Sequence, residues 1–126
     1  MRLNPDCTRD LLMLLEDNTE PGSCLCYTVS EISKALPKYT AKEIMYHVSQ
    51  CAASGMFIGY TPSLGGNFAI LDISPKAHEF LANVREESVW NKTKAIAKDV
   101  GANSLSALGQ IAASVITAII QKQLRL

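Results

Sequence analysis

Cysteine and histidine are the residues of this chain whose side chains could bind a metal ion. Cys24 and Cys26 lie in a short apolar stretch, and His47 and Cys51 are four residues apart, on adjacent turns of an expected helix. Three thiolates and one imidazole form a legitimate structural zinc set. Against zinc, Cys-x-Cys is not a usual ligand spacing, and Cys51 continues an apolar stripe where free cysteine acts as a small hydrophobe. Zinc is the lesser alternative, and we expect no metal and no cofactor.

The same side chains could in principle perform nucleophilic catalysis through a cysteine–histidine pair. Nothing near His47 or His78 resembles a catalytic signature or a glycine-rich oxyanion turn. The Gly65-Gly66-Asn67 segment fits hairpin turn chemistry better than a phosphate cradle, because no helix or lysine follows it. Glu86 and Glu87 are adjacent, so on a helix they point in different directions. The sequence therefore predicts a protein without enzymatic activity.

The elements that must position these residues follow from capping and hydrophobic spacing. Asn4-Pro5 is a favourable helix start, and Thr40 with Glu43 fits a capping box. The expected order is a helix over 4–16, a strand over 24–28, a helix that Thr28 or Ser30 caps and Pro37 stops, a helix over 40–54, a hairpin with strands 56–60 and 68–73 around a turn at 61–67, a helix from Ser74-Pro75, and helices over 89–100 and 103–124. This order is typical of a winged helix-turn-helix followed by two helices.

Length and composition agree with a small globular protein. The chain has 126 residues, of which 48% are hydrophobic and 19% charged, and its 12 basic and 12 acidic residues sum to zero charge. Zero net charge argues against a surface that binds nucleic acid or anionic lipid everywhere. The segment Met1–Asp6 lacks the layout of a secretory signal, so we expect a cytoplasmic protein with reduced cysteines. The predicted fold is α+β, predominantly helical, with a winged domain over 1–85 and a helical element over 86–126.

Three segments carry a resemblance to a known family: Arg2 to Cys7, Asp72 to Leu81, and Trp90 to Lys94. Over nearly its whole length the chain resembles an uncharacterised family, a domain of unknown function, of small winged-helix proteins from phages and prophages of Gram-positive bacteria. The resemblance implies a fold and a genomic setting. It implies no activity and no binding residues.

The helix over 40–54 is the expected recognition helix, with Ile44, Val48 and Cys51 facing inward and His47 near the outer side. The residues expected to contact DNA are Lys38, Tyr39, Lys42, Tyr46 and Gln50. The wing turn over 62–67 carries no lysine or arginine, which reduces the expected number of phosphate contacts. Two functions stay open: a phage or prophage DNA-binding regulator, or a module that uses the same fold to dock on a host protein.

The last helix has an unusually wide apolar face and no charged residue over 100–121. One helix of a small domain cannot easily hide such a face, so we expect a homodimer. The expected dimerisation residues are Leu105, Leu108, Ile111, Ala112, Val115, Ile116, Ile119 and Ile120. Polar residues such as Asn103, Gln110 and Thr117 interrupt the stretch, which disfavours a membrane-spanning segment.

Overall fold

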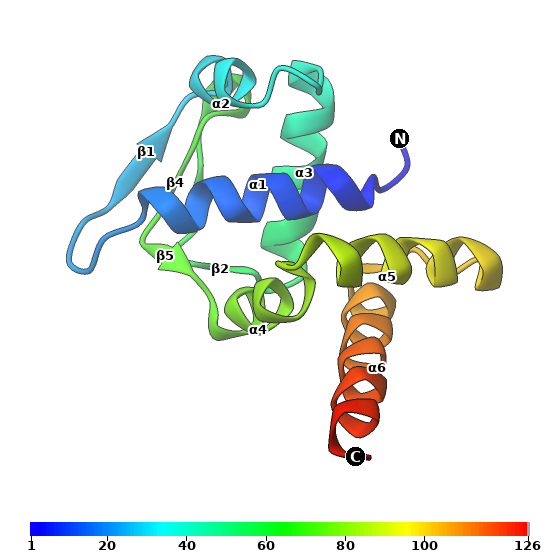
Figure 1. The fold of residues 1–126 in the computed structure, drawn as a ribbon. Helices are drawn as coiled ribbons and strands as arrows, with labels where there is room; N and C mark the ends of the chain where they lie inside the picture. The colour runs from blue at the N-terminus through cyan, green and yellow to red at the C-terminus, as the bar shows by residue number, and fades with distance from the viewer. Residues whose placement is uncertain (126) are drawn as a thin grey trace. The chain divides into compact units, whose positions relative to one another are not determined.

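The computed structural model describes residues 1–125, which form a mostly helical α+β protein (Figure 1), as the sequence predicts. The helices are α1 (Pro5–Asn18), α2 (Val29–Ala35), α3 (Ala41–Ala53), α4 (Pro75–Val84), α5 (Glu87–Val100) and α6 (Leu105–Leu124), and the strands are β1 (Leu25–Tyr27), β2 (Phe57–Ile58), β3 (Thr61–Pro62), β4 (Phe68–Ile70) and β5 (Asp72–Ile73). The chain folds as two compact units, residues 1–78 and 79–126.

The helix starts of the first unit are capped as the sequence indicates. The side chain of Asn4 accepts hydrogen bonds from the amides of Asp6 and Cys7, and Pro5 opens α1. Thr28, one of the two candidate caps, caps α2 by accepting from the amide of Glu31 at 3.1 Å. These bonds satisfy donors that a helix leaves free at its first turn.

The core of the first unit lies between α1 and α3. Three leucines of α1 are fully buried, and α3 packs its predicted apolar stripe against them. The buried set includes Leu11, Leu12, Leu15, Ile32, Ile44, Val48 and Cys51. The inward face predicted for the helix over 40–54 is therefore confirmed for Ile44, Val48 and Cys51.

The hairpin differs from the predicted one. Its arms form two antiparallel ladders: β2 pairs with β5, and β4 lies between β1 and β3. Gly59, at φ 67°, separates β2 from β3, and a Cβ there would lie 2.5 Å from Cγ of Leu71. Only glycine fits this backbone turn and close approach without displacing Leu71. Thr61–Pro62, expected in the turn, pairs with β4, so the turn is shorter and the first arm is broken.

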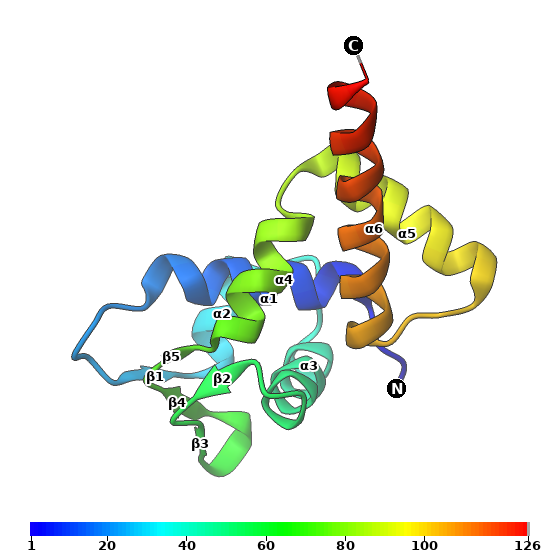
Figure 2. The ribbon, with the colours of Figure 1, turned by 90° about the horizontal axis from the view of Figure 1, so that it is seen from below.

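The second unit consists of the end of α4 with α5 and α6. Phe80 and Trp90 meet edge to face, with ring centroids 6.4 Å apart, and both side chains are buried. Beyond Trp90, α5 buries Val89, Thr93 and Ala97. After the loop at 101–104, α6 returns across α5 (Figure 2). Phe80 contacts Trp90, so the end of α4 belongs to the same unit as α5 and α6. The boundary between the units therefore falls after residue 78, whereas the sequence predicted it after residue 85.

The eight residues predicted to form the dimer contact differ in exposure: some are buried within the chain and others are open to solvent. The prediction that all eight face a second copy is therefore corrected. Leu105, Leu108, Ala112 and Val115 are buried within the chain itself, so they are not available to a second copy. Ile111 and Ile116 are half-buried, whereas Ile119 and Ile120 are 41% and 51% exposed. The helical spacing showed an apolar face but could not show how much of it the chain covers.

α6 is long and apolar enough to cross a membrane by length and composition, and 22% of its most apolar 18-residue window is buried in the structure. The core helix of a globular protein can pass the same test.

Candidate nucleic-acid interface

The turn between α2 and α3 orients the helix that carries most of the predicted contacts. α2 ends at Ala35 and α3 begins at Ala41. The capping box predicted here is confirmed: the Thr40 hydroxyl accepts from the amide of Glu43, and the Glu43 carboxylate accepts from the amide of Thr40, both at 3.1 Å. The two bonds fix the first turn of α3.

The outer face of α3 presents a mixed polar and apolar surface. Lys42, Met45 and Ser49 are exposed, and Tyr46 and Gln50 are half-buried beside them. The predicted residues Lys42, Tyr46 and Gln50 therefore lie together. The sequence analysis missed Met45 and Ser49, although their positions three and seven residues after Lys42 place all three on one helical face.

Tyr39 is a correction, because its ring is buried and does not face solvent. Its hydroxyl donates a hydrogen bond of 2.6 Å to Oδ2 of Asp10 on α1. Burial, together with this carboxylate, raises the pKa of Tyr39. Tyr39 thus fastens the turn to α1, and its ring is not exposed as the predicted contact required.

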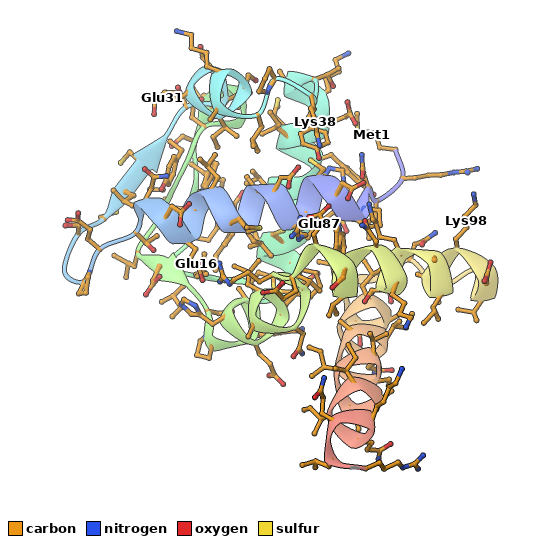
Figure 3. The ribbon with its side chains drawn as sticks, viewed as in Figure 1. Met1, Glu16, Glu31, Lys38, Glu87 and Lys98 are labelled. Atoms are coloured by element: carbon orange, nitrogen blue, oxygen red, sulfur yellow. The ribbon has the colours of Figure 1, made fainter. Side chains whose placement is uncertain are left out.

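Lys38, next to Tyr39, keeps an accessible ammonium group. Its side chain is 71% exposed, its Nζ lies 3.7 Å from Oδ2 of Asp10, and it sits 5.7 Å from the centre of the Tyr39 ring. An exposed pair at this distance is weak, so the lysine can still meet a phosphate. Figure 3 labels Lys38 among the side chains of the first unit.

His47 is the second correction, since its side chain is buried and not near the outer side. Nε2 accepts from the backbone amide of Asn4 at 2.8 Å, and Nδ1 lies 2.7 Å from the carbonyl of Glu43. The first hydrogen bond requires an unprotonated Nε2, so Nδ1 carries the proton and donates to the backbone carbonyl of Glu43. His47 therefore ties the start of α1 to α3.

Replacing His47 with alanine is expected to destabilise the first unit by about 2 kcal/mol, because it leaves the amide of Asn4 without its partner and opens a cavity. Chemical denaturation followed by circular dichroism measures this loss. The matched control is His78→Ala: His78 is exposed and lies 3.5 Å from Glu16, so its removal should change stability by no more than about 0.5 kcal/mol. Equal effects of the two substitutions would contradict the assigned role.

The turn predicted to be a wing is fixed against α2 and α3 by side-chain contacts. The amide of Ser63 donates to the carbonyl of Asn67 at 2.7 Å, which closes the turn around a short 3-10 segment, Leu64–Gly66. The Asn67 side chain accepts from the amide of Val29 at the start of α2. Gly66, at φ 81°, packs on α3, since a Cβ there would lie 2.6 Å from Cε of Met45. The turn at 63–67 therefore lies against the exposed face of α3.

The residues first considered for metal binding and catalysis are not brought together. Cys24 and Cys26 are exposed, whereas Cys7 and Cys51 are buried. Within residues 1–125, no three side chains of His, Cys, Asp or Glu gather closely enough to hold a metal ion. Burial raises the pKa of both Cys7 and Cys51 to about 12, which disfavours the nucleophilic thiolate. Both ring nitrogens of His47 are already hydrogen-bonded, so neither is free to activate a thiol.

Comparison with known proteins now identifies the family. Residues 2–103 match the family described as hypothetical protein (DUF2513). The chain belongs to this family. No curated protein and no solved structure matches the chain significantly.

The extent of the DUF2513 match separates two parts of the surface. The turn before α3, the outer face of α3 and the turn at 63–67 all lie inside the matched residues. The match ends at residue 103, before α6 begins at Leu105. The residues predicted to contact DNA therefore lie within the matched residues, and α6 lies after them.

Proposed function

We propose that this DUF2513 protein is a non-enzymatic regulator of phage or prophage genes that binds double-stranded DNA through a winged helix-turn-helix formed by residues 1–85. In this assignment α2 and α3 are the helix-turn-helix, α3 is the recognition helix, and the turn at 63–67 is the wing. The genomic setting rests on the sequence resemblance. The cytoplasm is the proposed location, where the four cysteines of the chain stay reduced.

The observation that carries the proposal is the attachment of the wing to the recognition helix. The Asn67–Val29 hydrogen bond and the contact of Gly66 with Met45 hold the wing turn beside the exposed face of α3. A helix of this kind reads base edges in the major groove, while neighbouring backbone segments contact phosphates. Lys42, Tyr46 and Gln50 are the proposed contacts from α3, joined by Ser49 and by Lys38 from the turn.

The charge of this surface sets the expected strength of binding. Lys34, Lys38 and Lys42 follow one another along α2, the turn and α3, opposed by Glu31 and Glu43, and the wing adds no charge. Each neutralised phosphate releases roughly 0.9 counterion. We therefore expect modest affinity with a shallow salt dependence.

The proposed active form is a dimer. Ile116 and Ile120 lie on one flank of α6, four residues apart, and leave apolar surface uncovered that a second copy can bury. Two copies would place two α3 helices in successive major grooves, roughly 34 Å apart. The bound site would then be a palindrome.

The test is selection from a random duplex pool, followed by fluorescence anisotropy on the enriched site at two salt concentrations. A palindromic site should emerge, and Lys38→Gln with Lys42→Gln should lower affinity about tenfold and reduce the salt slope by about 2. The control is Lys98→Gln, an exposed lysine that projects from α5 (Figure 3) and should leave affinity unchanged. Absence of binding to any duplex at low salt would overturn the proposal.

A second function, docking on a host protein, is favoured by the tip of the wing. Leu64 is 94% exposed on a closed turn without charge, and Ile58 and Leu71 are also exposed on the hairpin. A protein partner could bury these exposed apolar side chains, whereas DNA offers them no matching apolar surface. A photocrosslinker at position 64 distinguishes the two functions: it joins to DNA in the first case and to one host protein in the second.

A further inference from the structure

A groove of about 590 Å³ lies between α5 and α6, within the second unit. It is lined by Lys92, Ile96, Gln110, Ile111, Ser114, Val115, Ala118, Ile119 and Lys122. Its volume is within the range of sites for small organic ligands, roughly 300 to 1,000 Å³. The residues that line it run along α6 from Gln110 to Lys122, about 18 Å at the helical rise. The groove is therefore long enough for an extended chain.

The lining combines an apolar floor with positive charge. Ile96, Ile111 and Ile119 supply branched aliphatic surface, and two lysines, Lys92 from α5 and Lys122 from α6, supply ammonium groups. None of the described side chains that line the groove is acidic. A ligand with matching chemistry carries a negative charge at one end and an aliphatic chain behind it.

We propose that this groove binds the anion of a fatty acid with an alkyl chain of about twelve carbons. The carboxylate lies between Lys92 and Lys122, and the alkyl chain follows α6 over Ile111, Ala118 and Ile119. Charge-assisted hydrogen bonds to the carboxylate and removal of methylene groups from water both favour binding. The proposal does not depend on DNA binding, because its residues lie outside α2, α3 and the wing.

Small side chains on α6 make room for the alkyl chain. Ser114 and Ala118 are exposed and line the groove four residues apart, so a larger side chain at either position would fill it. Ala113 is also exposed on α6 but does not line the groove. Ala118 and Ala113 therefore allow a matched test, on one helix, of whether the alkyl chain occupies the groove.

The experiment is calorimetric titration of the full chain with dodecanoate, kept below its micelle concentration. One equivalent should bind, and dodecanol, which lacks the charge, should bind about tenfold more weakly. Ala118→Trp should abolish binding, whereas Ala113→Trp should preserve it. Lys92→Gln with Lys122→Gln should weaken dodecanoate about tenfold and leave dodecanol unchanged, and Lys98→Gln should change neither.

Any of these results would overturn the assignment: no heat of binding with the folded chain, equal loss in both tryptophan variants, or binding to vesicles of anionic phospholipid without binding to free dodecanoate. The last result would make α6 a membrane-surface helix. A dimer that Ile119→Asp separates, with no dodecanoate bound, would assign the groove to a second copy. Failure of the protein to bind DNA would not change the interpretation of any of these results, so the two proposals are tested separately.

Discussion

Replacing Trp90 with alanine is expected to destabilise the second unit by about 3 to 5 kcal/mol, the usual cost of removing a large buried aromatic side chain. Trp90 is 1% exposed and meets Phe80 edge to face, and Nζ of Lys94 lies 5.7 Å from its ring centre. The unit has only α5, α6 and the end of α4 to bury around this ring. An alanine there leaves a cavity that so small a core cannot refill.

The aromatic residues allow the two units to be followed separately. Trp90 is the only tryptophan, and the four tyrosines, Tyr27, Tyr39, Tyr46 and Tyr60, all lie in the first unit. In the Trp90→Ala variant, which lacks the tryptophan signal, the part of the far-ultraviolet circular dichroism signal that comes from α5 and α6 should be lost at lower urea. The tyrosine signal, which reports the first unit, should keep its midpoint. Asn91→Ala, at an exposed neighbour, is the control and should change stability by less than about 0.5 kcal/mol. A loss below 1 kcal/mol for Trp90→Ala would show that the ring does not hold the unit together.

Local signals in the sequence were sufficient to predict where the helices of the first unit begin. Asn4, Thr28 and Thr40 act as caps in the structure because capping depends on neighbouring amides within one turn. The inward positions of α3 follow in the same way from helical spacing.

Features set by tertiary contacts could not be predicted from the sequence. A helical projection of α3 leaves His47 near the surface, and Tyr39 lies in the turn before this helix. Both are nevertheless buried, Tyr39 beside Asp10 of α1 and His47 beside Asn4, which caps α1. Those partners are 29 and 43 residues away in sequence, so the spacing of hydrophobic residues along the chain cannot predict them. The break at Gly59 likewise depends on Leu71, twelve residues later, which fills the space a Cβ would need.

Alkaline pH is expected to destabilise the protein through two buried thiols, Cys7 and Cys51. Burial raises the pKa of each from 9.0 to about 12. Below pH 9 the thiols are protonated in both the folded and the unfolded chain, and their contribution to stability is complete. Between pH 9 and 12 the unfolded chain loses these protons and the folded chain keeps them, so the free energy of unfolding falls by about 1.4 kcal/mol per pH unit for each thiol.

Urea unfolding between pH 8 and 10, under reducing conditions, measures this slope. Burial also raises the pKa of Tyr39 above its usual value of 10.0, so Tyr39 adds a loss of the same sign, but only from about pH 10 upward. The variant Cys7→Ala with Cys51→Ala should be less stable at pH 8 yet lose less stability on going to pH 10. Cys24→Ser with Cys26→Ser is the matched control: both thiols are exposed, and the slope of the original chain should persist. A slope that is the same in all three proteins would mean that the buried thiols ionise as readily in the folded chain as in the unfolded one, and that the contact between α1 and α3 is open to water.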